Sequence, residues 1–290
     1  MSENAGHAGG ESDGRQGQPW RGRSRPKRDR ARHPSRPRDG RRRPRPTRDS
    51  GRETTRPLGE RAHGTPEPDV PEEITGHELD PAVRRELGTL AKPTAVRVAR
   101  HLVAAGQLLE DDPELALEHA QAARRAAPRL GVVREACGLA AYQAGRYDLA
   151  LAELRAARRM TGSVEYVPVM ADCERGLGRP ERALDLVASV DRATLDLATR
   201  IELLIVEAGA RRDLGQLAAA LTVLDVPELR MRSAHPAIAR LRYAYADTLT
   251  QLGRRKEAAS WFARAAEADL EGETDAEERY AALVSEMDVS

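Results

Sequence analysis

The chain has 290 residues, and its 47 Lys and Arg against 46 Asp and Glu give a formal net charge of only +1. The charges are unevenly distributed, because residues 1–66 hold 18 basic and eight acidic residues and have a net charge of +10. Residues 67–290, which we call the body, therefore have a net charge of −9. Two Cys exclude a disulfide-rich scaffold. The most apolar run, residues 201–210, is too short and too rich in Glu to span a membrane.

We expect residues 1–66 to be a disordered tail rich in Arg, Pro and Gly. Trp20 is its one large aromatic residue, and Leu58 is the only Leu, Ile or Val before Val70. So little apolar surface cannot offset a chain entropy of about 1–2 kcal/mol per residue. No apolar stretch follows the basic start, as a secretory signal would require. The sequence therefore favours a cytoplasmic protein, and the preference for Arg over Lys is typical of a GC-rich bacterial genome.

Residues 67–77 form an acidic, proline-rich segment that we expect to be an extended linker. Helical patterns begin at residue 78 and continue to residue 290. Asp80 before Pro81, and Asp112 before Pro113, each combine an N-cap residue with Pro at the first helical position. No run typical of a strand is bounded by turns, so this body is predicted to be all-α.

A glycine turn recurs through the body, at Gly-Arg or Gly-Gln pairs that begin at residues 145, 178, 215 and 253. An alanine follows five residues after each glycine, and Ala116 occupies the same place in a first unit that lacks the glycine. These five alanines are Ala116, Ala150, Ala183, Ala220 and Ala258, separated by 34, 33, 37 and 38 residues. An earlier small residue recurs as Ala104, Gly138, Ala171, Ala208 and Ala246.

This pattern resembles the tetratricopeptide repeat, a helix–turn–helix unit of 34 residues, over residues 94–268. The resemblance implies a solenoid of about five repeats in which small residues let paired helices approach closely. The family's large first-helix residue, however, falls here on Arg100, Arg134, Val167, Leu204 and Arg242. The apolar seam runs instead through Val103, Cys137, Met170 and Tyr245. Pro227 should end one helix early, and the longer steps predict insertions at 191–200 and 227–236.

Terminal helices should close the array at both ends, since a stacked solenoid needs a polar outer face where it meets water. Residues 81–91 are the candidate at one end. Residues 274–287 are the candidate at the other, with a capping box of Thr274 and Glu277. We expect Tyr280, Leu283, Val284 and Met287 to pack inward and Glu278, Arg279 and Glu286 to face solvent.

Nothing in the sequence indicates an enzyme, a cofactor or a metal site. Cys137 and Cys173 fall inside apolar first helices, where a small buried thiol is favoured over a disulfide, a ligand or a nucleophile. The seven His show no paired spacing. His119 is interpreted as a solvated or partly packed ring. No glycine-rich phosphate loop follows a strand.

The first functional hypothesis is a non-enzymatic scaffold or adaptor that holds an unidentified protein or peptide in a concave groove, without membrane contact. Transferring the family's groove positions to this chain gives nine candidates: Glu135, Tyr142, Glu165, Asp172, Arg175, Arg212, Tyr243, Asp247 and Gln251. Each could equally be ordinary surface. The carboxylate clamp of chaperone-receptor members is absent, because no Lys or Asn stands at the matching positions.

The alternative is a protein that binds RNA, DNA or another polyanion through the basic tail. Arginine forks suit phosphate groups, and release of counterions drives such binding. Trp20 is the only aromatic residue available for base stacking. The tail could also cover the acidic repeats, or only keep the protein soluble. The candidate arginines are Arg21, Arg23, Arg25, Arg28, Arg30, Arg41, Arg42, Arg43 and Arg45.

Overall fold

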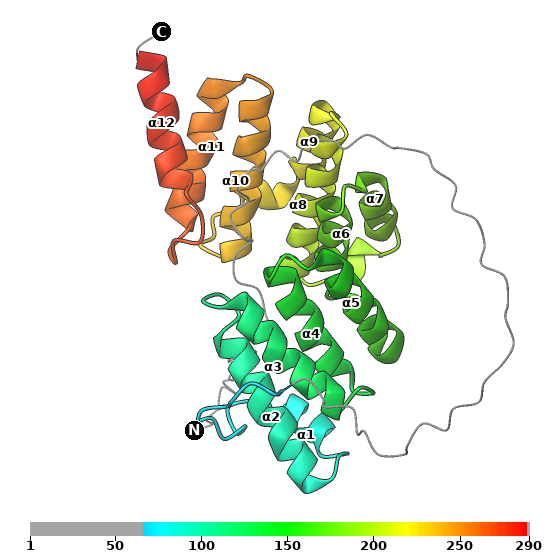
Figure 1. The fold of residues 1–290 in the computed structure, drawn as a ribbon. Coiled ribbons are helices and arrows are strands. Elements are labelled where there is room, and N and C mark those ends of the chain that lie inside the picture. Colours follow the sequence, from blue (N-terminus) through cyan, green and yellow to red (C-terminus); the bar gives the residue numbers. More distant parts are fainter. Residues whose placement is uncertain (1–65, 289–290) are drawn as a thin grey trace, which may run out of the picture.

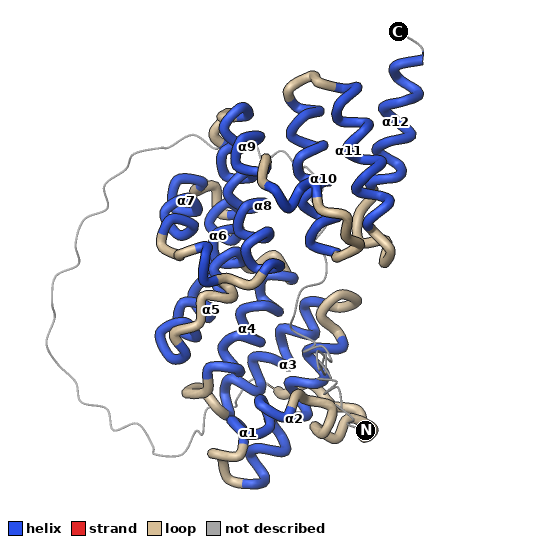
Figure 2. Tube along the Cα trace, turned by 180° about the vertical axis from the view of Figure 1, so that it is seen from behind, coloured by secondary structure: helices blue, strands red, loops and turns tan. Residues whose placement is uncertain are grey.

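The computed structural model describes residues 66–288 of the chain, and this part is all-α, with helices and loops and no strand (Figure 2). Its first six helices are α1 (Pro81–Leu87), α2 (Lys92–Gln107), α3 (Pro113–Ala126), α4 (Gly131–Gln143), α5 (Tyr147–Thr161) and α6 (Val167–Gly176). The others are α7 (Pro180–Ala188), α8 (Leu197–Asp213), α9 (Leu217–Leu224), α10 (Pro236–Gln251), α11 (Arg255–Ala268) and α12 (Ala276–Asp288). The 3₁₀ turns η1 (Arg192–Thr194) and η2 (Pro227–Arg230) occupy the two expected insertions.

Consecutive helices pack as hairpins, namely α2 with α3, α4 with α5, α6 with α7, α8 with α9, and α10 with α11 (Figure 1). Each hairpin contacts the next one, while α1 lies against α2 and α12 against α11. Three groups of buried residues follow one another along the chain, from α1–α6 through α6–α8 to α8–α12. The core therefore extends along the array as three successive groups and has no single centre.

The turns and helix contacts follow the pattern of small residues. The four turn glycines, Gly145, Gly178, Gly215 and Gly253, have φ values of 70° to 76°, a left-handed conformation that suits glycine. All five alanines of the repeating position are 0% exposed. Gly138 shows the reason, because a Cβ there would lie 2.6 Å from Leu154 Cδ2 in the partner helix.

Arg100, Arg134 and Arg242, on the first helices of three hairpins, each bind backbone carbonyl groups. Arg100 donates from Nε to Ile74 O at 2.7 Å and from Nη2 to Pro71 O at 2.9 Å. Arg134 donates to Pro128 O at 3.0 Å, and Arg242 donates to Leu229 O at 3.3 Å. These side chains thus attach connecting segments to the hairpins, a role that an apolar residue could not fill.

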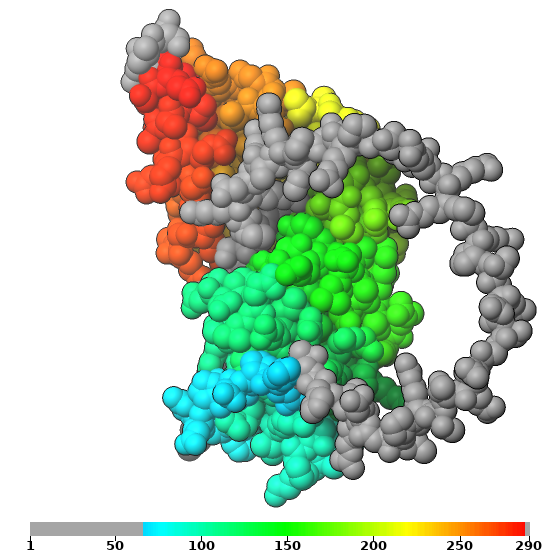
Figure 3. All heavy atoms as spheres, in the orientation of Figure 1, coloured from blue at the N-terminus to red at the C-terminus, as the bar shows by residue number. Residues whose placement is uncertain are grey.

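The acidic segment 67–77 packs against α2, in contrast to the extended linker expected from its composition. Ile74 and Leu79 are 7% and 2% exposed and belong to the first buried group. Gly76 has a φ of 88°, and its Cα lies so close to α2 that a Cβ would approach Ala99 Cβ to 2.7 Å. The start of the described chain lies at the surface beside the α2–α3 hairpin (Figure 3). A shallow pocket of about 420 Å³ separates residues 67–70 from α2.

His119, interpreted from the sequence as a solvated or partly packed ring, is instead fully packed inside the protein. His119 is 2% exposed, and its Nδ1 lies 3.0 Å from Nδ1 of His101, which is 3% exposed. His101 Nε2 in turn lies 3.5 Å from Glu67. Burial lowers the pKa of both histidines. No local pattern in the sequence indicates this contact, because the two residues lie on different helices, 18 positions apart.

The C-terminal helix differs from expectation in its cap and in one face. Thr274 donates to Asp269 at 2.7 Å, in place of a capping box with Glu277. Tyr280 is 40% exposed. Arg279, expected in solvent, turns inward, with its guanidinium 4.9 Å from the centre of the Phe262 ring. Leu283 is buried, as the periodicity indicates.

No helix within residues 66–288 is long and apolar enough to cross a membrane.

The buried alanine contacts predict a large difference between two substitutions on one helix. Ala150→Arg would place a charge in a fully buried helix contact and should destabilise the fold by several kcal/mol, on the order of 3–5. Ala152→Arg, at an exposed position of the same α5, should change stability by about 0.5 kcal/mol or less. Thermal denaturation followed by circular dichroism measures both. Equal effects would contradict the packing.

Candidate partner-binding surface

Eight of the nine groove candidates lie on the first helices of successive hairpins, and Glu165 lies just before α6. Glu135 and Tyr142 belong to α4, Asp172 and Arg175 to α6, Arg212 to α8, and the rest to α10. The structure brings these nine residues into three groups. In two groups they join neighbouring helices through hydrogen bonds and ion pairs.

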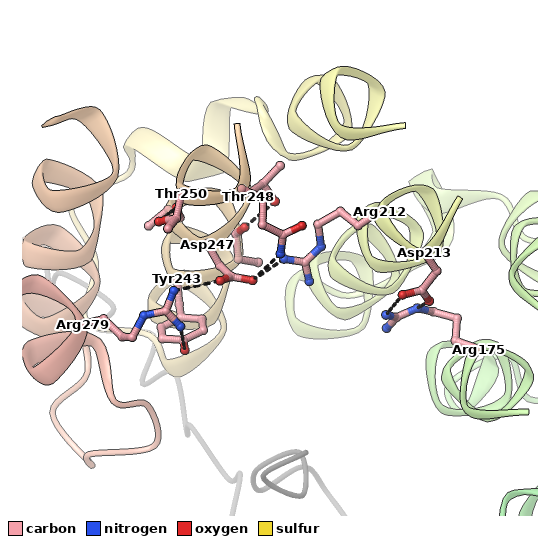
Figure 4. Close-up of polar contacts among 11 residues, drawn as sticks. Arg175, Arg212, Asp213, Tyr243, Asp247, Thr248, Thr250 and Arg279 are labelled. Carbon is pink, nitrogen blue, oxygen red and sulfur yellow. Dashed lines mark hydrogen bonds and ion pairs between the residues drawn. The ribbon is translucent and has the colours of Figure 1, made fainter. Parts of the chain in front are cut away.

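The first group links α4, α6 and α8. Tyr142 donates to Asp172 at 2.6 Å, and Arg175 donates from Nη1 to the same carboxylate at 2.7 Å. The Arg175 guanidinium also binds Asp213 at 2.8 Å through Nε and at 3.2 Å through Nη2 (Figure 4). Arg175 and Asp172 are 9% and 6% exposed. A buried arginine between two carboxylates has its charge compensated, which permits its burial.

Gly209 on α8 makes the reach of Arg175 possible. A Cβ at Gly209 would lie 2.4 Å from Arg175 Cζ, so the guanidinium passes directly over the bare helix backbone to reach Asp213. On α10 the corresponding position holds Asp247, and there the arginine of the preceding helix stops and binds the carboxylate directly. Gly209 thus leaves room for the Arg175 side chain to pass, whereas Asp247 binds the equivalent Arg212 directly.

The second group links α8, α10 and α12. Asp247 accepts from Arg212 of α8, from Arg279 of α12 at 3.0 Å, and from Gln251 at 3.3 Å (Figure 4). Arg279 also donates to Tyr243 Oη at 3.3 Å. Burial and a hydrogen bond with Asp275 raise the pKa of Tyr243 above its ordinary value, so its hydroxyl keeps its proton at neutral pH.

The third group is acidic and holds Glu135 and Glu165, together with Glu86 of α1. Burial, together with the negative charges of Glu165 and Glu86, raises the pKa of Glu135 to about 7. Glu86 accepts from the Val132 N–H at 3.5 Å. Glu135 is therefore partly protonated at neutral pH, unlike an ordinary surface carboxylate.

Sequence reasoning missed three residues of these groups, namely Asp213, Arg279 and Glu86. The bonds between first helices, and the bond from α12, join residues 30 to 38 positions apart, which is about one hairpin. An Arg and an Asp about one hairpin apart in the sequence form a pattern that could have identified Asp213 and Arg279. Glu86 gave no such signal, because it lies on α1, outside the repeating pattern.

The two cysteines are buried and free, as expected, with 0% exposure each. Burial raises the pKa of the Cys137 thiol to about 12, and that of Cys173 rises for the same reason. Such thiols stay protonated at neutral pH and are poor nucleophiles. Among residues 66–288 no three His, Cys, Asp or Glu side chains are arranged to hold a metal ion.

The nine tail arginines, Arg21 to Arg45, lie outside the described residues, so the polyanion hypothesis for the tail rests on the sequence alone. No protein-family model matches this chain, and no curated protein is similar to it. The assignment of a function therefore depends on the residues and their geometry.

The effects on stability of substitutions at Gly209 and at Arg175 should depend strongly on each other. Gly209→Ala should displace the guanidinium from its two carboxylates and destabilise the fold by about 1–3 kcal/mol, because buried charges lose their partners. In an Arg175→Ala background the same change should be neutral or stabilising by up to about 1 kcal/mol, since Ala favours helix more than Gly does. Urea unfolding of the four proteins of this cycle measures the coupling, and additive effects would contradict it.

Glu135 should make stability depend on pH. Its folded pKa of about 7 exceeds the ordinary value of 4.5, so its contribution is complete below pH 4.5 and is lost as the pH rises through 7. Glu135→Gln should therefore raise the melting temperature at pH 8 and change it little at pH 4.5. The exposed Glu118→Gln serves as the control. An equal shift at both pH values would show that the carboxyl is not perturbed.

Proposed function

We propose that the protein is a non-enzymatic scaffold or adaptor whose body is a solenoid of tetratricopeptide-like repeats. The observation that carries this proposal is the polar ladder, by which we mean Tyr142, Asp172, Arg175, Asp213, Arg212, Asp247 and Arg279. It links the first helices from α4 to α10, and then α12, through bonds between residues about one hairpin apart. Five stacked hairpins and their glycine turns support the same interpretation.

An array of this kind offers a long surface and no enclosed centre, because each unit contacts only its neighbours. The first helices form one side of that surface. The ladder fixes how the first helices α4, α6, α8 and α10 lie against one another, and so it sets the spacing of exposed side chains along this part of the surface. An extended segment of a partner protein could then contact several hairpins at once, which distributes its binding energy over many weak contacts.

The ladder residues themselves have most of their hydrogen-bonding capacity satisfied within the chain. We therefore propose that they shape the groove and that neighbouring, more exposed side chains contact the partner. Gln251 is exposed and Glu165 is half-buried, and both lie beside ladder residues or Glu135. Glu165 and Gln251 are thus the candidates best placed for direct contact.

A comparison of two double variants tests this proposal. Glu165→Arg with Gln251→Arg alters the first-helix surface, while Glu118→Arg with Glu181→Arg makes charge changes of similar kind at exposed positions of second helices. Full-length protein carrying a photo-crosslinker would be used to capture partners from native cytosol, followed by measurement of binding to the purified partner. We expect the groove variant to weaken binding about tenfold or more and the control to bind normally.

Loss of binding in the control alone, with the groove variant intact, would place the interface on the second helices and contradict the proposed groove. Circular dichroism of each variant shows whether the fold is retained.

A further inference from the structure

A second surface of the body carries unpaired positive charge. Three helices, α1, α3 and α5, each have an Arg-Arg pair in the last turn. These pairs are Arg84–Arg85, Arg124–Arg125 and Arg158–Arg159. Arg129 stands in the loop after α3, and Lys92 begins α2.

The packing places the ends of these three helices together at one edge of the array. Glu86, in the last turn of α1, accepts from the N–H of Val132 in the first turn of α4. At the start of the same helix, a Cβ on Gly131 would lie 2.4 Å from Thr161 Cγ2, the last residue of α5. The α3 helix ends just before this point, and its Arg124 binds Glu153 of α5 at 2.9 Å. The ends of α1 and α5 lie in the lower part of Figure 1.

We name as the basic edge the six residues Arg84, Arg85, Arg125, Arg129, Arg158 and Arg159. Within residues 66–288 none of these six side chains has an ion pair or a hydrogen bond, whereas Arg124 between them is bound to Glu153. Five of them are exposed and Arg158 is half-buried. Most arginines of the acidic body are paired with carboxylates or bound to carbonyl groups, as Arg100, Arg175 and Arg240 are. The basic edge is therefore unusual for this body, whose net charge is negative.

We propose that the basic edge binds the phosphate backbone of a nucleic acid. A guanidinium group can form two parallel hydrogen bonds with a phosphate. Several guanidinium groups along the basic edge favour a linear polyanion over a single small anion. No aromatic ring belongs to the basic edge, so binding is independent of sequence.

Other anionic partners fit the basic edge less well. A membrane surface requires apolar side chains that insert beside the basic ones, and an acidic protein segment requires pockets for its own apolar side chains. Of the exposed large hydrophobic residues in the described chain, which are Val96, Met160, Met231, Leu270 and Tyr280, only Met160 adjoins the basic edge. The basic edge thus offers positively charged side chains and few apolar ones, and positive charge is what binds a phosphate backbone. None of the six arginines is a groove candidate, since five lie on α1, α3 and α5 and Arg129 lies in the loop after α3.

Two triple variants of the full-length protein, matched in charge, test this inference. The first, Arg85→Gln with Arg129→Gln and Arg159→Gln, removes three charges from the basic edge. The second, Arg182→Gln with Arg232→Gln and Lys256→Gln, removes three exposed charges from other parts of the body. Binding of a fluorescein-labelled 20-nucleotide polyuridine would be measured by fluorescence anisotropy between 50 and 200 mM salt.

The edge variant should bind about tenfold more weakly at 100 mM salt, and the slope of log K against log salt should fall by about 2, close to 0.7 for each lost phosphate contact. The affinity of the control variant should differ from that of the wild-type protein by less than about twofold, because salt screens charges that lie away from the bound polyuridine.

Equal losses in the two variants would overturn the proposal, because net charge would then account for the binding. No binding by the wild-type protein would overturn it as well. Competition by polyglutamate as effective, charge for charge, as unlabelled polyuridine would assign the edge to an acidic protein segment instead. Since the scaffold proposal is tested with Glu165 and Gln251, its failure and the failure of this one are distinguishable.

Discussion

Close approach of the two helices within each hairpin is the constraint on which the rest of the structure depends. Ala116, Ala150, Ala183, Ala220 and Ala258 are all fully buried where second helices meet first helices. A larger residue at any of them would separate the pair, since interiors packed like crystals have no room for additional atoms. Gly138 on the first helix α4 shows the same lack of space, because a Cβ there would overlap Leu154 of the second helix. Once the helices of a pair are this close, the next hairpin can stack against both.

Small residues alone leave the register between hairpins loosely defined. Buried ion pairs define this register more closely. Glu153 is 4% exposed and lies 2.9 Å from Arg124 and 2.7 Å from Arg134. Glu174 is fully buried and lies 2.7 Å from Arg155 of the preceding hairpin. Removing one partner of such a pair typically costs about 3–5 kcal/mol, because the remaining charge stays buried. The pairs therefore penalise any shift of one hairpin against the next, as the polar ladder does on the first helices.

The two surfaces that we propose for binding differ in how their charges are used. On the first helices, arginines and aspartates mostly compensate each other's charge, so that surface offers a partner its shape and its neighbouring exposed side chains. On the basic edge, six arginines have no partner within the described chain, so their charge is available to a ligand. One chain can thus combine a shaped interaction surface with a purely electrostatic one, without the two competing for residues.

Much of the helical pattern could be read from the sequence, because it depends on neighbours in the chain. Asp80 and Asp112 cap their helices as expected, since a cap needs only the residues two or three positions on. The glycine turns and the buried alanines followed from a period of 33 to 38 residues. The nine groove candidates fell largely on linked first helices, but their roles as links between helices depend on contacts one hairpin apart.

Only the tertiary structure decided the remaining features, which are contacts between residues far apart in sequence. The His101–His119 contact, the packing of Ile74 against α2 and the inward turn of Arg279 each depend on where another helix lies. Composition identified residues 67–77 as polar, yet the carbonyl groups of this segment are bound by Arg100, and no local pattern encodes that. The sequence by itself therefore determined the helices, their turns and their small-residue contacts, because these interactions are local or periodic. Tertiary packing determined which charges were paired and which were left exposed, because pairing depends on distances that only the folded array defines.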